Sequence, residues 1–195
     1  MPTSSNVSIE PVVLTADDDY LRRVRRTSLA MVLASTALMA VLPVALVIYW
    51  WTASAGELAS QGNLQSSVIQ TALQAWQRVV AAGVSAVPLG LLLMGLWQAK
   101  RCFAQFALGQ VFTKDAVAHL RRFAGWVALA AAAAILAGAA ISVVLTYNNA
   151  PGTRQLSLGI SSNHLFTLFF AALVWLMADV IGQGQALAQE NGQFV

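Results

Sequence analysis

The chain has 195 residues, of which 58% are hydrophobic and only 10% are charged. Soluble domains carry about a quarter charged residues, so this chain has too few charges to coat a water-soluble core. The formal net charge is +3. Because the basic residues flank apolar runs, anionic lipid headgroups suit them better than nucleic acid does, and we expect no direct nucleic-acid binding.

Residues 1–21 are rich in Ser, Thr and Asn near their start and hold three consecutive aspartates, Asp17 to Asp19. They have little apolar surface to bury, so we expect a disordered N-terminal segment on the cytoplasmic side. Residues 22–195 then form a single transmembrane domain.

The first apolar run spans residues 28–51 and ends on Tyr49, Trp50 and Trp51, residue types that favour the membrane–water boundary. A cleaved signal peptide is the alternative, because Ala53-Ser54-Ala55 resembles a cleavage site. The apolar run has 24 residues, however, against about 7–15 in a signal peptide. The pattern favours an uncleaved signal-anchor helix, bent at Pro43.

The second span covers residues 79–99, between Arg78 and Lys100. Before it, apolar residues recur at helical spacing from Val68 to Val80. This predicts that the second helix begins outside the membrane, near Ser66, and places Trp76 at the interface.

The connection after the second span predicts a short amphipathic helix that runs into the third span, residues 125–145. Gly109 is suited to end the preceding helix, Thr113 to act as N-cap, and Asp115 to interact with the helix dipole. Within the third span, Ala130, Ala134 and Gly138 repeat every four residues, and such small residues let helices approach closely. We expect this helix at the centre of the bundle, and its small-residue face would also permit a homo-oligomer.

The connection between the third and fourth spans alternates Leu156, Leu158 and Ile160 with polar residues. Either a short strand or an irregular loop fits this pattern. The fourth span covers residues 165–181 and carries Asp179, the one charge inside any span. The fold class is therefore an all-α membrane protein with four transmembrane helices.

Nine of the eleven Lys and Arg residues lie at two places, before the first span and between the second and third. Short cytoplasmic connections hold an excess of such residues. We therefore expect both termini on the cytoplasmic side of the membrane. The two clusters are Arg22, Arg23, Arg25, Arg26 and Lys100, Arg101, Lys114, Arg121, Arg122.

Asp179 is the main candidate for intramembrane chemistry, because charges inside spans are rare and usually paired. It lies near the cytoplasmic end of its helix, so it is either a proton or cation site or a partner for Lys100, Arg101, Arg121 or Arg122. His119 and His164 are predicted on opposite sides of the membrane. No metal-binding spacing, nucleophile elbow or phosphate loop is present, so the sequence indicates no catalytic residue, cofactor or metal, and no enzyme.

Two segments, GQVFTKDAVAHLRRFAG before the third span and GQGQALAQENGQFV at the end, carry a family resemblance. The chain from about Arg22 onward resembles the bacterial membrane family called domain of unknown function 2975. The family tail G-x-x-L-x-x-E-N-x-x-x-V corresponds to Gly184, Leu187, Glu190, Asn191 and Val195. Gly192 and Gln193 depart from the acidic or apolar residues expected there.

The resemblance implies no biochemical activity, but family members are often encoded beside a small Cro-type helix-turn-helix regulator. The leading hypothesis is thus a regulatory or scaffolding membrane protein whose cytoplasmic face binds a small protein. The alternative is a small transporter or channel subunit that uses Asp179. The candidate partner-binding face comprises Gly109, Thr113, Arg121, Arg122, Gly184, Glu190 and Asn191.

Overall fold

The computed structural model describes the backbone of residues 12–69, 72–108 and 113–192, and within them it contains helices and no strand. Four helices are long and apolar enough to cross a membrane. This confirms the predicted all-α, four-span fold class. The elements are α1 (Val12–Thr52), α2 (Ala55–Gln61), the short 3-10 turn η1 (Ser66–Val68), α3 (Ala75–Ala107), α4 (Lys114–Thr146) and α5 (Ser162–Gly192).

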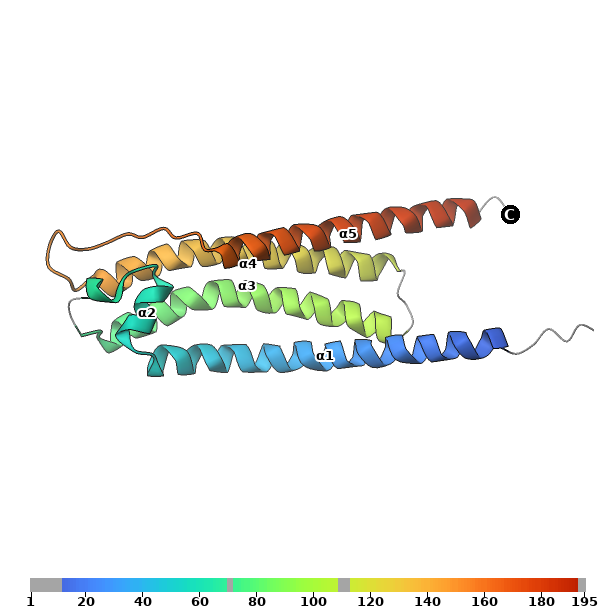
Figure 1. Cartoon of the computed structure of the whole chain (residues 1–195), viewed down its shortest axis with the longest axis horizontal. Helices are drawn as coiled ribbons and strands as arrows, with labels where there is room; N and C mark the ends of the chain where they lie inside the picture. Colours follow the sequence, from blue (N-terminus) through green and yellow to red (C-terminus); the bar gives the residue numbers. More distant parts are fainter. Residues whose placement is uncertain (1–11, 70–71, 109–112, 193–195) are drawn as a thin grey trace, which may run out of the picture.

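The four long helices lie side by side in the order α1, α3, α4, α5 (Figure 1). α3 packs against both α1 and α4, and α4 packs against α5 and also against α2. In the most apolar stretch of α4, 44% of the residues are buried inside the protein, against 6–11% in the corresponding stretches of the other three spans. The buried face of α4 includes Ala130 and Gly138, which confirms the predicted central place of this helix.

Aromatic residues mark two levels along the helices. Trp76 and Tyr147 form an edge-to-face pair with ring centroids 5.6 Å apart at the end of the molecule opposite the termini, here the outer end. On α3, Trp97 follows Trp76 by 21 residues, and on α4, Trp126 precedes Tyr147 by the same number. Each interval is about 32 Å of helix, close to the thickness of a bilayer's hydrocarbon core.

The fourth span begins well short of the outer aromatic level. Ser162, the first residue of α5, precedes Trp175 by 13 residues, so only about 20 Å of helix rises from the inner aromatic level. The chain between α4 and α5 makes up the remaining distance: it turns at the outer end and runs back along α4 to Ser162 (Figure 1). Non-helical backbone at such depth is tolerated only where protein groups satisfy it.

Side chains of the last α4 turns hydrogen-bond two backbone N–H groups of this returning chain. The Ser142 hydroxyl accepts a hydrogen bond from the Ser157 backbone N–H at 2.9 Å, and the Thr146 hydroxyl accepts one from Gln155 at 3.2 Å. The Ser157 hydroxyl in turn donates to the Asn63 carbonyl at 3.0 Å. These contacts between the returning chain, α4 and the α2 turn form what we call the outer clasp.

Leu156, Leu158 and Ile160 alternate in the direction of their side chains, as the sequence suggested, but this segment is not a β-strand. The loop is irregular, and all three side chains point away from α4, with exposed fractions of 69%, 65% and 66%. Between them, Ser157 and Gly159 are half-buried and contact the protein: Ser157 contacts Ser142 and Asn63, and Gly159 lies against Asn63. At membrane depth, this arrangement turns the apolar side chains toward lipid and the polar groups toward their partners.

Gln77 and Arg78 join α3 to its neighbours at the outer end. The buried Gln77 amide donates to the Val144 carbonyl at 2.9 Å. The Arg78 guanidinium donates to the carbonyls of Trp50 and Ala53 at 3.0 and 3.1 Å. Arg78 thus caps the end of α1, where carbonyls lack helical partners and the dipole favours a cation.

Two helix starts differ from the sequence predictions. Helix α1 already begins at Val12, whereas residues 1–21 were expected to be disordered; residues 1–11 lie outside the described part. Helix α3 begins at Ala75 rather than near Ser66, where η1 makes a single turn. The third span lies within α4, whose start at Lys114 includes the predicted amphipathic segment, and the fourth span, Ser162–Gly184, extends three residues beyond its predicted bounds at each end.

Helix α2 was not predicted, although its start has a recognisable signal. Ser54 and Glu57 form a capping box, in which the Ser54 hydroxyl accepts from the Glu57 N–H and the Glu57 carboxylate accepts from the Ser54 N–H. Hydrogen bonds from the Ser54 backbone and then from its hydroxyl lower the pKa of Glu57. The spacing Ser-x-x-Glu after the first span was the available indication.

We predict that Arg78→Ala lowers the free energy of unfolding by about 1.5–3 kcal/mol, because the last α1 carbonyls lose a charged donor. The matched control is Arg154→Ala, which removes an exposed outer cation that stacks over Tyr147 and should cost less than about 1 kcal/mol. The free energy of unfolding of each variant can be measured by steric trapping in mixed micelles, under conditions in which unfolding is reversible. Equal losses for the two variants would contradict the capping role.

Candidate functional site at the inner ends of α4 and α5

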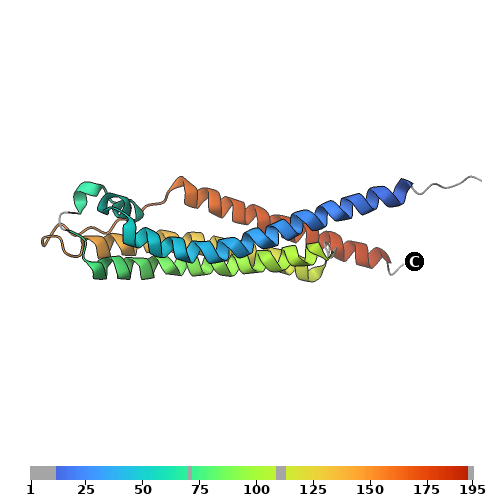
Figure 2. The ribbon, with the colours of Figure 1, turned by 90° about the horizontal axis from the view of Figure 1, so that it is seen from below.

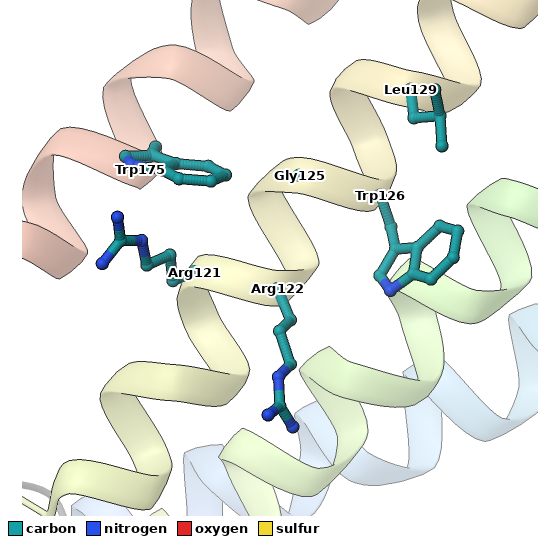
Figure 3. A pocket seen from close by; sticks show the side chains of 6 residues that line it. All are labelled: Arg121, Arg122, Gly125, Trp126, Leu129 and Trp175. Atoms are coloured by element: carbon teal, nitrogen blue, oxygen red, sulfur yellow. The ribbon is translucent and has the colours of Figure 1, made fainter.

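Asp179 on α5 pairs with Arg121 on α4 at the inner end, with Arg121 Nη1 3.4 Å from Asp179 Oδ1. The same guanidinium lies over the Trp175 ring, 4.9 Å from its centroid. Figure 3 shows the Arg121 side chain directed toward Trp175, across the gap between the two helices. We call Arg121, Gly125, Trp175 and Asp179 the inner clasp.

Helical spacing explains why these four residues meet. Trp175 and Asp179 are four residues apart on α5, and Arg121 and Gly125 are four apart on α4, so each pair shares one helix face. A Cβ added to Gly125 would lie 3.2 Å from the Trp175 ring. Glycine at this position therefore lets the indole approach α4. Sequence reasoning singled out Arg121 and Asp179 but missed Gly125 and Trp175, which the spacing Trp-x-x-x-Asp could have indicated.

Of the four cations expected as alternative partners for Asp179, the structure pairs it with Arg121. The Arg121 and Asp179 side chains are 54% and 36% exposed, so the ion pair alone contributes about 0–1 kcal/mol.

The structure distributes the other predicted partner-face residues over α4 and α5. Thr113 is the N-cap of α4, as predicted, with its hydroxyl accepting from the Ala116 N–H. Arg122 follows Arg121 on α4, but its side chain is directed away from Trp175, toward α3 (Figure 3). A Cβ at Gly184 would meet no atom within 4 Å. Glu190 and Asn191 lie in the last turns of α5. Gly109 lies outside the described residues.

Helices α1 and α5 extend beyond the inner ends of α3 and α4, and their ends are separate in both views (Figures 1 and 2). α5 keeps contact with α4 at least as far as Gly182, where an added Cβ would lie 3.5 Å from the Val117 side chain. From Asp179 to Gly192 it runs for 13 residues, about 20 Å of helix. The projecting parts of α1 and α5 are called the two arms.

The histidines lie at separate places and make local contacts. His119 Nδ1 is 2.7 Å from Gln98 Oε1, between α4 and α3, whereas His164 Nδ1 is 2.9 Å from the Ser161 hydroxyl at the start of α5. Cys102 is buried, with its sulfur 3.5 Å from the Ala116 carbonyl. Across the described residues, no three His, Cys, Asp or Glu side chains gather as a metal site would need.

We predict that Gly125→Val lowers the free energy of unfolding by about 1–3 kcal/mol, because the added methyl groups displace Trp175. Gly90→Val is the matched control, since its Cβ would meet nothing within 4 Å. Unfolding titration, with tryptophan emission as a second readout, compares the two. If Gly90→Val were as destabilising as Gly125→Val, the contact between Gly125 and Trp175 would not be the cause.

The match to a family model covers residues 65–193, that is η1, α3, α4 and α5 with their connections, and the description of the family is "Protein of unknown function (DUF2975)". The matched part begins later than Arg22, where the resemblance was first placed. No curated protein and no solved structure matches the chain. A match over more than half of the chain establishes the relationship: this protein belongs to the DUF2975 family.

Proposed function

We propose that this chain is a non-catalytic, regulatory or scaffolding protein of a bacterial inner membrane, whose inner end binds a small cytoplasmic protein. The projection of α1 and α5 past the ends of α3 and α4 carries this proposal. Helical segments that leave the bundle without a neighbour at their ends offer two separate surfaces to a soluble partner.

The charges at the inner end support a partner with an acidic surface. Lys100 and Arg101 end the apolar part of α3, and Lys114, Arg121 and Arg122 lie in the first three turns of α4. Attraction of an acidic protein to this cationic end would raise the rate of association more than the final affinity. A Cro-type helix-turn-helix regulator is the partner that the family resemblance implies, and it would bind through a surface other than its basic DNA-binding face.

Transport through Asp179 is less well supported than partner binding. A transport role would need Asp179 to face a polar pathway, whereas this carboxylate has Arg121 as its partner and Trp175 one turn away. We therefore assign Asp179 to joining α4 and α5.

The test of partner binding is co-purification of the full chain with a Cro-type regulator encoded beside its gene. We expect recovery of the regulator to fall roughly tenfold when Glu190→Lys and Asn191→Ala are combined on the α5 arm, as expected for loss of a binding hot spot. Ala150→Lys on the outer loop is the control and should leave recovery unchanged. A regulator that never co-purifies with the native chain, or that ignores the α5 substitutions, removes the proposal.

The proposed orientation has its own test. In a Cys102→Ser background, we introduce a single cysteine at Ala150, in the outer loop, or at Gly184, on α5. With both termini in the cytoplasm, a membrane-impermeant maleimide should label Ala150→Cys in intact spheroplasts and should label Gly184→Cys only after lysis. The reverse pattern would contradict the orientation and, with it, a cytoplasmic partner.

A further inference from the structure

A hollow of about 370 Å³ lies beside the inner clasp, on the flank of α4 and α5 (Figure 3). Its lining consists of Arg121, Arg122, Gly125, Trp126, Leu129 and Trp175. A second hollow of about 620 Å³ shares Gly125, Leu129 and Trp175 with it and continues between α4 and α5 toward the outer end. Together they form one groove with a cationic inner end and an apolar remainder, here named the flank groove.

The cationic end has more positive charge than its own carboxylate neutralises. Arg121 shares its guanidinium between Asp179 and the Trp175 ring. No described carboxylate pairs with Arg122, whose side chain is exposed. Two guanidinium groups against one carboxylate leave a net single positive charge at the level of the inner aromatic residues, where lipid headgroups lie.

The apolar part of the groove has the character of a path for an acyl chain. Small residues, including Ala128, Ala171 and Ala172, line it, and no charged side chain does. An acyl chain gains little free energy by entering it, because the surrounding lipid is equally apolar. Selectivity must therefore come from the headgroup, and guanidinium groups bind phosphate through paired, charge-assisted hydrogen bonds.

We propose that the flank groove binds one anionic phospholipid, with its phosphate at the groove end that Arg121 and Arg122 flank from opposite sides (Figure 3) and one acyl chain between α4 and α5. The charge of the groove end and its level in the membrane support this occupant. A zwitterionic lipid would bring its own cation close to the two arginines, so it would bind more weakly. This site lies on the flank of the bundle, apart from the arms, and does not depend on the proposed protein partner.

Asp179 of the inner clasp affects how tightly the flank groove binds an anionic lipid. Asp179 competes with the lipid phosphate for Arg121, and its own charge repels the headgroup. Asp179→Asn should therefore tighten binding of an anionic lipid, while Arg122→Gln should weaken it. A carboxylate whose removal improves binding is an outcome that a purely structural ion pair does not predict.

The experiment measures lipid retained by the purified full chain in a neutral detergent by native mass spectrometry. The probes are phosphatidylglycerol and phosphatidylcholine with identical acyl chains. We expect phosphatidylglycerol to be preferred, roughly three- to tenfold weaker binding for Arg122→Gln, and at least about twofold tighter binding for Asp179→Asn. Arg154→Gln, the matched loss of a cation at the outer end, should change nothing.

Inorganic phosphate is the probe in the second part of the experiment. At millimolar concentration it should not displace phosphatidylglycerol, because a lipid site needs the acyl chain to place the headgroup. Displacement by phosphate would mean that the ligand is a soluble anion and would overturn the lipid assignment. Equal binding of the two lipids, or an equal effect of Arg122→Gln and Arg154→Gln, would do the same. If Arg122→Gln yields no folded protein, the direction of the Asp179→Asn effect decides.

Discussion

The structure depends on one constraint: backbone polar groups that lie at membrane depth must find partners within the protein. A full-length fourth helix would meet this constraint alone, but α5 begins about 10 Å below the outer interface. In the chain between Gln155 and Ser161, the N–H groups of Gln155 and Ser157 donate hydrogen bonds to the side chains of Thr146 and Ser142 on α4. Each of these two hydroxyls accepts a hydrogen bond from a loop N–H group and donates its own proton to an α4 backbone carbonyl, so each hydroxyl has both a donor and an acceptor as partners.

The outer clasp also explains residues that hydropathy alone leaves unexplained. Arg78 is a basic residue on the predicted outer side, and its contacts with the α1 carbonyls account for its place there. Gly62 and Gly138 allow the α2 turn to lie directly on α4: a Cβ at either would approach atoms of the partner to within 3.0 or 3.1 Å. The outer end is therefore joined by hydrogen bonds and close backbone contacts, whereas the inner end holds exposed cations and projecting helix arms.

Sequence reasoning was sufficient for the features that depend on length and period. Four apolar runs of about 20 residues predict four spans, and the cap at Thr113 was placed correctly because its chemistry is local. The predicted start of α3 was wrong because Val68, Ile69 and Leu73 have helical spacing in the sequence without forming a helix. They pack instead against the buried cluster at the outer end. The inward direction of the polar loop residues was not predictable, since it depends on Ser142, which lies 15 residues earlier in the chain.

For the site, the sequence indicated the charged members and missed the uncharged ones. Asp179 and Arg121 stand out because charges are rare in this chain, but the sequence left Arg121 as one of four possible cationic partners, and the structure shows the pair. Gly125 and Trp175 are ordinary residues in a membrane helix, and only the packing of α4 on α5 gives them a role. The flank groove likewise requires three-dimensional knowledge, because its lining comes from both helices.

The depth of the loop before α5 is the central claim, and site-directed spin labelling tests it most directly. A nitroxide is attached at Leu158→Cys in a Cys102→Ser background, and a second at Ala150→Cys, with the protein in lipid bilayers. The account predicts that the label at 158 collides freely with oxygen dissolved in lipid and is shielded from a water-soluble nickel relaxant, while the label at 150 behaves in the opposite way. Strong relaxation of the label at 158 by the nickel reagent would place this loop in water and contradict the account.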